Sequence, residues 1–197
     1  MSDKYGTGQD VQYCYPRSNV LVNKLGLTDA DALDAAEIAL TQARIEQFEP
    51  NFDDFSLQAL RAIHFHLFQD LYDWAGALRT VDISKGSTRF ANVRRIEPEA
   101  DKLFRQLEQE RCLIGLPRAQ FTARLAHYYC ELNILHPFRD GNGRAQRLMF
   151  ELIGINAGFE VRWEPIDRKE WVDANIAAYH CRLDSLTDLL DRALTPI

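Results

Sequence analysis

The sequence predicts an all-α fold that carries one short β-hairpin. Apolar residues recur at spacings of three and four over most of the 197 residues, and capping residues or prolines precede several of these stretches. Only residues 81–91 alternate apolar and polar side chains, around Lys85-Gly86, which is a hairpin pattern. With 46% hydrophobic residues the chain can bury a single core, expected as one domain over 1–197 with a core over about 56–191 and a helical extension over 1–55.

Two helices are predicted in the first part of the chain. Thr28-Asp29 is a capping sequence, and the helix that it opens passes through Ala35, Ile38, Ala39 and Ile45 before a break at Pro50-Asn51. A second helix over residues 56–75 ends at Gly76 and has the core face Leu57, Leu60, Ile63, Leu67, Leu71 and Trp74. His64 and His66 on it are expected to pack or face solvent, because no carboxylate-rich ligand set accompanies them.

Proline marks the start of two further helices, over residues 98–111 and 117–133, since a missing N–H costs little in a first turn. The second leads directly into Leu135 and His136. Residues 144–153 predict a helix that ends before Gly158 and has the apolar stripe Leu148, Met149, Leu152 and Ile153. Residues 167–191 predict one or two helices with the core candidates Trp171, Ile176, Leu183 and Leu186.

Charge and cysteine content exclude several classes of protein. A net charge of −6 argues against a dominant nucleic-acid surface, although Arg139, Arg144 and Arg147 form a local basic spot. Residues 1–10 lack an apolar signal core, and no apolar run is long enough to span a bilayer. We therefore expect a cytoplasmic protein that contacts neither nucleic acid nor a membrane. No Cys-x-x-Cys spacing occurs, which predicts reduced, structural thiols at Cys14, Cys112, Cys130 and Cys181.

The most informative segment is the twelve-residue run 136–147. Pro137 disfavours a helical conformation in the residue before it, so we expect His136 on an extended loop, presented rather than packed. Gly141-Asn142-Gly143 can turn so that successive N–H groups converge at the start of the next helix. The unpaired N–H groups of a helix N-terminus suit a phosphate.

Two arginines and one acid accompany this turn. Arg144 and Arg147 are three residues apart, so they share a helix face and can reach the same polyphosphate. Asp140 alone would repel phosphate, and Mg²⁺ resolves that conflict because it is usually held by one carboxylate, phosphate oxygens and water. Each group taken singly is more often a solvated histidine, a plain turn or a salt-bridged helix face. Their conjunction indicates a nucleotide triphosphate site.

The run matches every specified position of the Fic family signature, His-Pro-Phe-x-Asp-Gly-Asn-Gly-Arg-x-x-Arg, and segments 63–76 and 80–86 are also similar to that family. The chain thus resembles compact bacterial toxin-like members over nearly its whole length. The resemblance implies a Fic-type helical bundle and a protein adenylyltransferase that moves AMP from ATP·Mg²⁺ to a Ser, Thr or Tyr hydroxyl. It implies His136 as general base, Asp140 as Mg²⁺ ligand, Phe138 as core anchor, the N–H groups of Gly141, Asn142 and Gly143 as anion hole, and Arg144 and Arg147 on the β- and γ-phosphates.

Gly143 bears on which phosphate is attacked. A related branch of the family, typified by a kinase-like toxin, has lysine at this position, binds the triphosphate reversed and transfers the γ-phosphate. Glycine here therefore favours nucleotidyl transfer. A phosphotransferase or other nucleotide-derived transferase on the same scaffold, a secreted effector of the same chemistry, and a catalytically silent nucleotide-binding module are the alternatives.

The hairpin resembles the family's flap, whose edge pairs with an extended segment of the target and sets its hydroxyl opposite His136. Either Phe90 or Ile83 is expected to pin the target side chain. The residues expected to bind the target are Ile83, Lys85, Gly86, Ser87, Thr88 and Phe90.

Regulation is expected to come from another protein. Many family members carry a self-inhibiting helix, Ser/Thr-x-x-x-Glu-Gly/Asn, whose glutamate pairs with the second arginine of the signature. No Ser or Thr of this sequence begins that pattern. We therefore expect the toxin of a toxin–antitoxin pair, inhibited in trans by a small antitoxin that presents a glutamate to Arg147. Bacterial relatives of this type modify type II topoisomerases, so the resemblance suggests DNA gyrase or a related enzyme as target.

Overall fold

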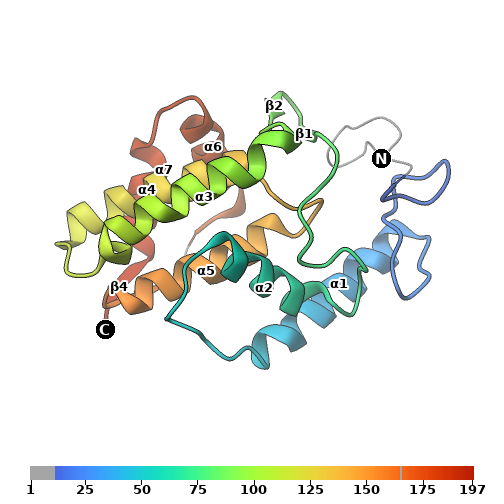
Figure 1. Cartoon of the computed structure of the whole chain (residues 1–197), viewed down its shortest axis with the longest axis horizontal. Helices are drawn as coiled ribbons and strands as arrows, with labels where there is room; N and C mark the ends of the chain where they lie inside the picture. Colours follow the sequence, from blue (N-terminus) through green and yellow to red (C-terminus); the bar gives the residue numbers. More distant parts are fainter. Residues whose placement is uncertain (1–11, 165) are drawn as a thin grey trace.

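The computed structural model describes residues 12–164 and 166–197, and the expectations for residues 1–10 and for the start of the 1–55 extension fall outside them. Helices dominate the described residues, and the predicted all-α class with a short hairpin is confirmed (Figure 1). The elements in chain order are α1 Ala30–Glu46, α2 Leu57–Phe68, β1 Ser84–Lys85, β2 Thr88–Arg89, α3 Val93–Gln109, the 3₁₀ turn η1 Arg111–Leu113, α4 Arg118–Leu135, α5 Asn142–Asn156, β3 Phe159–Val161, α6 Arg168–Tyr179, α7 Asp184–Ala193 and β4 Leu194–Pro196.

Helix α1 begins where its capping residue predicts, because the Asp29 side chain accepts the N–H of Ala32 at 2.9 Å. Its buried face is not the one with the most apolar residues. Glu37 is 7% exposed whereas Ile38 is 67% exposed. A carboxylate is buried only when other groups pair with it, so Glu37 must have partners inside the fold.

Helix α2 ends at Phe68, seven residues before the predicted end. The chain then turns back, and the N–H groups of Leu71 and Tyr72 both donate to the carbonyl of Phe68. Gly76 has a φ of 74° and lies so close to α2 that a Cβ there would be 2.9 Å from the Arg61 carbonyl. Of the apolar residues expected on the last turns, Leu71 is fully buried and Trp74 is half-buried, and turns rather than a helix place both.

Helix α3 begins at Val93, five residues before the expected proline start, and Pro98 lies inside it. The Asn92 side chain caps the helix by accepting the Arg94 N–H at 3.1 Å. Asp82, at the base of the hairpin, accepts the N–H of Val93 at 2.8 Å. Two polar side chains therefore satisfy the first turn of α3 and join it to the hairpin.

Helix α5 lies at the centre of the packing, in contact with α2 and α4, while α1 covers α2 and α7 packs on α4 and α6 (Figure 1). Ile176, a core candidate, is 45% exposed, whereas Leu186 is fully buried. The four cysteines form no disulfide with one another, and Cys181 is exposed. The largest fully buried side chains are Tyr72, Tyr128, Tyr129, Phe68, Phe121, Phe138 and Phe150.

The described residues contain two small antiparallel sheets. In the first, Ser84 pairs with Arg89 and Lys85 with Thr88. The predicted hairpin is therefore present, but its turn is Gly86-Ser87, one residue later than expected, and Gly86 supplies the positive φ of 59° that such turns need. The second sheet, β3 with β4, was not predicted from the sequence because strands of three residues show no alternation.

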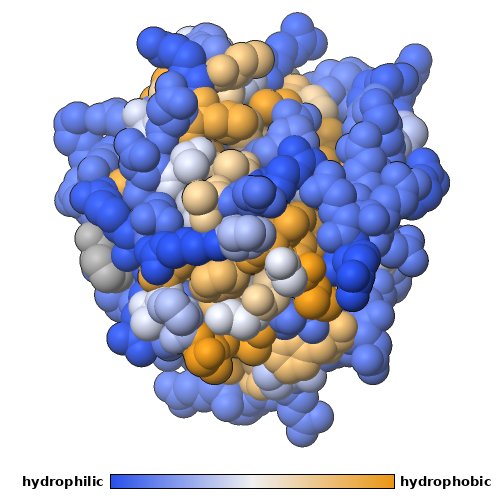
Figure 2. Space-filling view, turned by 90° about the vertical axis from the view of Figure 1, so that its left-hand side faces the viewer, coloured by the Kyte–Doolittle hydropathy of each residue, from blue (hydrophilic) through white to orange (hydrophobic). Residues whose placement is uncertain are grey.

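The end of the molecule that carries the C-terminus is partly apolar. Figure 2 shows orange side chains gathered on this face, and its elements carry the exposed residues Ile114, Ile155 and Ile197. Among the described residues, no helix combines the length and the hydropathy that crossing a membrane requires.

Candidate active site

A cavity of about 440 Å³ opens between the 136–147 run, the hairpin and α6. The run contributes His136, Asp140, Gly141, Asn142, Gly143, Arg144 and Arg147, and the hairpin contributes Lys85, Thr88 and Phe90. A second cavity, of about 500 Å³, lies between residues 52–57, α3 and η1 and contains no residue of the run. Only the first cavity therefore brings the predicted chemistry together.

One wall of this cavity was not predicted. Six residues of α6 line it, and Ile176, expected in the core, is one of them. Their spacing would serve equally for packing against another helix, so the sequence gives no signal that separates a pocket wall from a core face. The residues are Arg168, Trp171, Val172, Asn175, Ile176 and Tyr179.

His136 is the C-cap of α4 and has a left-handed backbone, with φ 45° and ψ 64°. It is also only 8% exposed, and its ring stacks on Phe90 with centroids 3.8 Å apart. The expected extended, presented histidine is therefore wrong. Pro137 disfavours the right-handed helical region at His136, and the left-handed conformation, which commonly ends helices, satisfies that restriction as well as an extended one does.

The environment of His136 suits a proton acceptor. Its Nδ1 lies 3.2 Å from the carbonyl oxygen of Asn133, which can only accept, so Nδ1 carries the proton and Nε2 is the basic nitrogen. Burial lowers the pKa of His136 to about 3, and the positive charge of Arg79 acts in the same direction. The imidazole is therefore neutral at physiological pH, as a general base must be.

The glycine turn after His136 is held from inside the loop and from α2. The Asn142 side chain accepts the Phe138 N–H and donates to the Phe138 carbonyl, both at 2.8 Å. His64 is fully buried, accepts the Gly76 N–H on Nδ1 at 2.9 Å and donates from Nε2 to the Asp140 carbonyl at 2.9 Å. The expectation that His64 packs is confirmed, but it also supports the loop through a hydrogen bond.

Gly141 has no space for a side chain. Its φ is 75°, and a Cβ would lie 2.4 Å from the Phe68 ring and 3.0 Å from Nε2 of His64. Gly143 differs, because its φ is not positive and a Cβ there would meet only Nη1 of Arg147 at 3.6 Å. The first glycine is therefore required by the fold, whereas the second keeps space open next to Arg147.

Asp140 and the N-terminus of α5 form the polar floor of the cavity. The Gly141 N–H donates to Oδ1 of Asp140 at 2.7 Å, so one of the three N–H groups expected in the anion hole contacts protein instead. Asn142 and Gly143 open α5, where N–H groups have no partner within the helix. One carboxylate beside these N–H groups fits Mg²⁺, which takes most of its ligands from phosphates and water.

The three arginines of the run point in different directions. The guanidinium of Arg144 forms an ion pair with Glu37 of α1, and its carbon lies 4.7 Å from the centroid of the Phe68 ring. Arg139 is 2% exposed and faces the ring of Tyr13 at 5.9 Å, outside the cavity lining. The prediction that all three arginines form one basic spot is therefore wrong, because Arg139 is buried in the fold. Arg147 and Arg144 line the cavity.

The two hairpin candidates for pinning a target differ in position. Ile83 is 2% exposed and packs with Val81 and Phe90 as a separate small cluster. Phe90 lines the cavity and covers His136. The Tyr179 hydroxyl of α6 donates to the carbonyl of Arg89 at 3.0 Å, so the hairpin is attached to the opposite cavity wall as well.

The Fic/DOC family matches residues 54–153 of the chain. The chain is 43% identical to the probable protein adenylyltransferase Fic of Salmonella typhimurium over 99% of its own length and 97% of that protein. It is 45% identical to the protein of the same name from Escherichia coli, over 89% and 87% of the two chains. Its structure is similar to that of the VirB-translocated effector BepC of Bartonella tribocorum with bound AMPPNP, with a TM-score of 0.89, 27% identity and coverage of 96% and 99%.

The two glycines give a matched pair of variants. We expect Gly141→Ala to lower the free energy of unfolding by about 3 kcal/mol, because it adds left-handed strain to an overlap with Phe68. Gly143→Ala should change it by less than about 1 kcal/mol, because its Cβ would make an ordinary contact. Urea denaturation of both variants measures the difference, and equal losses would contradict the assigned roles.

Stability should fall with acidification through the buried histidines. Burial lowers the pKa of His64 to about 4, below the ordinary 6.5, so the folded state binds fewer protons than the unfolded state. Its contribution is complete above pH 6.5 and is lost as pH falls toward 4, by about 1.4 kcal/mol per pH unit. His64→Gln keeps one donor and one acceptor, so its unfolding free energy should depend less steeply on pH between 6 and 4.5. Parallel curves for the two proteins would refute this.

Proposed function

Because the chain belongs to the Fic/DOC family, we propose that it is a protein adenylyltransferase in which His136 is the general base for transfer of AMP from ATP to a hydroxyl of a target protein. One observation carries the proposal: a single cavity holds the basic nitrogen of a neutral His136, the N-terminus of α5 and Asp140. A proton acceptor beside a phosphate site is what nucleotidyl transfer to a hydroxyl requires.

The chemistry follows from these positions. The oxygen of the target hydroxyl attacks the α-phosphorus, and Nε2 of His136 takes the proton of that hydroxyl. The bond from the α-phosphorus to the oxygen that bridges to the β-phosphate breaks, and pyrophosphate leaves with that electron pair. The N–H groups of Asn142 and Gly143 stabilise the charge on the phosphates. The low pKa of His136 keeps the acceptor unprotonated.

Asp140 is the residue that would hold Mg²⁺. The ion, when bound, supplies neutralisation of charge on the phosphates. Since the Gly141 N–H already orients Oδ1 of Asp140, the carboxylate is set in place before a nucleotide arrives.

The two arginines have different parts in binding the triphosphate. Arg147 lies next to the space that Gly143 leaves open, and we assign it to the terminal phosphates. Arg144 lines the same cavity while Glu37 holds one side of its guanidinium. Glu37 in turn accepts the Tyr72 hydroxyl at 2.5 Å. Arg144 therefore approaches the phosphates from a fixed position, which reduces the entropy lost on binding.

The α6 wall is the place for the nucleoside. It offers the apolar side chains Val172 and Ile176, which are 41% and 45% exposed, next to the amide of Asn175. Apolar side chains with a few polar groups are typical of small-molecule sites. BepC binds AMPPNP, as its structure is described, which supports an adenine nucleotide as the ligand of the similar fold here.

The hairpin is assigned to the target protein. Its sheet consists of two strands of two residues each. An extended segment of the target could pair with an edge of this sheet by main-chain hydrogen bonds and become an added strand. Phe90 is the better candidate for pinning the target side chain, because it lies in the cavity against His136 whereas Ile83 is buried behind it. Ile83, Lys85, Gly86, Ser87, Thr88 and Phe90 are the residues assigned to target binding.

The proposal includes how the activity is inhibited and which protein is modified. The absence of the self-inhibiting pattern supports a toxin held inactive in trans by a small antitoxin whose glutamate pairs with Arg147. DNA gyrase or a related type II topoisomerase is the proposed target, and the bacterial cytoplasm, where ATP is available, is the proposed compartment. We treat residues 1–197 as one domain in this proposal.

Label placement tests the direction of transfer. Wild-type protein with ATP·Mg²⁺ and cell lysate should attach the label of [α-³²P]ATP, but not of [γ-³²P]ATP, to a protein. His136→Ala should abolish this transfer and leave the affinity for ATP nearly unchanged, since the base contacts the acceptor rather than the phosphates. Peptide mass spectrometry identifies the modified residue. Transfer of the γ label would support the phosphotransferase alternative, and full activity of the alanine variant would remove His136 from its role.

Inhibition in trans predicts a small binding partner. Pull-down of the protein from its native cells should recover one, and the chain expressed without it should be toxic. Arg147→Ala should lower the affinity for this partner, because the inhibitory glutamate loses its guanidinium, whereas Arg105→Ala, on α3 outside this cavity, should leave the affinity unchanged. Harmless expression together with no co-purifying partner would count against a toxin–antitoxin pair.

A further inference from the structure

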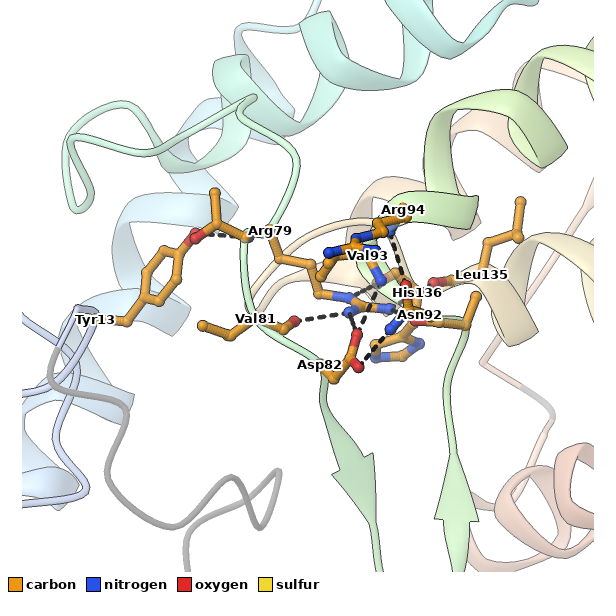
Figure 3. A network of polar contacts seen from close by, with 11 residues as sticks. Tyr13, Arg79, Val81, Asp82, Asn92, Val93, Arg94, Leu135 and His136 are labelled. Atoms are coloured by element: carbon orange, nitrogen blue, oxygen red, sulfur yellow. Dashed lines mark hydrogen bonds and ion pairs between the residues drawn. The ribbon is translucent and has the colours of Figure 1, made fainter.

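Arg79 is buried between the hairpin and the loop that carries His136, and it is only 3% exposed. Its guanidinium donates to four backbone carbonyls (Figure 3). Two of them lie at the catalytic loop, His136 at 2.8 Å and Leu135 at 3.2 Å. The other two, Val81 at 2.7 Å and Ala91, lie at the two ends of the hairpin segment.

Two backbone hydrogen bonds also connect the hairpin segment to the residues around His136. The Arg79 N–H donates to the Pro137 carbonyl at 2.9 Å, and the Ala91 N–H donates to the Ile134 carbonyl at 3.0 Å. The hairpin segment is therefore attached to the end of α4 at both of its ends. A planar guanidinium with five N–H donors can bind carbonyls in several directions at once, which a lysine cannot do.

Asp82 extends this network to α3. One oxygen of its carboxylate lies 3.8 Å from Nη1 of Arg79 and accepts the Val93 N–H, and the other accepts the Asn92 side chain at 2.6 Å (Figure 3). The cap of α3 and the base of the hairpin thus share one acid. Asp82 also provides the charge that Arg79 needs, because an unpaired buried guanidinium would be costly.

The network bears directly on the catalytic geometry. A left-handed backbone at a residue with a side chain costs about 1–2 kcal/mol, and the bond from Nε of Arg79 to the His136 carbonyl offsets part of that cost. The same guanidinium fixes both ends of the segment that carries Phe90, whose ring covers His136. Moving the hairpin relative to His136 requires breaking these bonds.

We propose that Arg79, with Asp82, is a positioning residue for transfer: it holds the target-aligning hairpin and the general base His136 as one unit, so that a hydroxyl bound along the hairpin meets Nε2. The inference rests on the function proposed above for His136 and the hairpin. It assigns to Arg79 no contact with substrate. Its effect is on the distance and angle between the acceptor hydroxyl and the base, to which transfer rates are very sensitive.

The Arg79→Lys variant tests the positioning role, because lysine keeps the positive charge but lacks the planar guanidinium with its several N–H donors. We expect kcat for transfer of the α label, measured well below the Tm, to fall about 10²-fold, while the Kd for AMPPNP stays near the wild-type value. The Tm should fall, because buried carbonyls lose their donors. Exchange of the Ala91 amide should become faster, and amides of α5 should not change. Arg124→Lys is the matched control, because Arg124 also makes paired bonds, to Glu110, but lies outside the cavity.

A second variant keeps the inference testable if Arg79→Lys does not fold. Asp82→Ala removes the counter-charge of Arg79, but the four carbonyls still accept from the guanidinium and the Asp82 side chain is 38% exposed, so we expect this variant to fold with a lower Tm. It leaves the four carbonyl bonds of Arg79 in place and frees the hairpin base from α3, so we expect kcat to fall about 10-fold and KM for the target to rise. The KM for ATP should not change.

The results separate this inference from the proposed function. Wild-type kcat in both variants, or a loss that follows AMPPNP affinity, would show a merely structural Arg79 and overturn the inference. If the wild type itself transfers no α label, or His136→Ala stays active, the proposed function fails instead. A lower kcat in Arg79→Lys with normal nucleotide affinity, in an enzyme that depends on His136, supports the positioning role.

Discussion

The contact between His64 and the Asp140 carbonyl is the constraint on which the rest of the site depends. It joins α2, buried in the core, to the Gly141-Asn142-Gly143 turn, whose N–H groups are proposed to bind the phosphates. Gly141 lies flat against Phe68 and His64, and the ring of Phe138 stacks on His64 with centroids 3.9 Å apart. The turn therefore cannot move without opening the core. Close packing of this kind tolerates small shifts poorly. The turn is therefore held as rigidly as the helix on which it packs.

Glu37 shows how the chain manages a buried charge next to a phosphate site. Its carboxylate pairs with Arg144 and accepts the Tyr72 hydroxyl, so it is satisfied within the fold. Burial, together with the charge of this carboxylate, raises the pKa of Tyr72. The group is thus a neutral donor, and its hydroxyl hydrogen-bonds the Glu37 carboxylate that pairs with Arg144. A buried pair of this kind contributes little to net stability, because desolvation offsets the attraction. Its value lies in fixing the direction of Arg144.

Much of the fold and of the phosphate site could be predicted because both depend on local sequence. Caps and periodicity located α1 and α5, and the 136–147 run identified its own turn and helix. What failed were one helix end and features set by distant residues. Helix α2 was predicted too long because the apolar spacing continues past Phe68, where the N–H groups of Leu71 and Tyr72 turn the chain back onto the Phe68 carbonyl. The Glu37–Arg144 pair joins residues 107 apart, and Arg79 reaches residues 56 and 57 positions away. A single sequence contains no signal for such contacts.

The two sides of the cavity differ in how rigidly the rest of the fold holds them. The phosphate side rests on α5 and the core, with N–H groups set before any ligand arrives. The target side rests on strands of two residues, which are not stable by themselves. It keeps its place through hydrogen bonds at its base and through the bond from the Tyr179 hydroxyl to the Arg89 carbonyl on β2. Residues 85–87 at the turn are exposed, whereas Ile83 and Phe90 are buried. Under the proposed function, sequence changes at this turn would alter which protein the hairpin aligns without altering the N-terminus of α5.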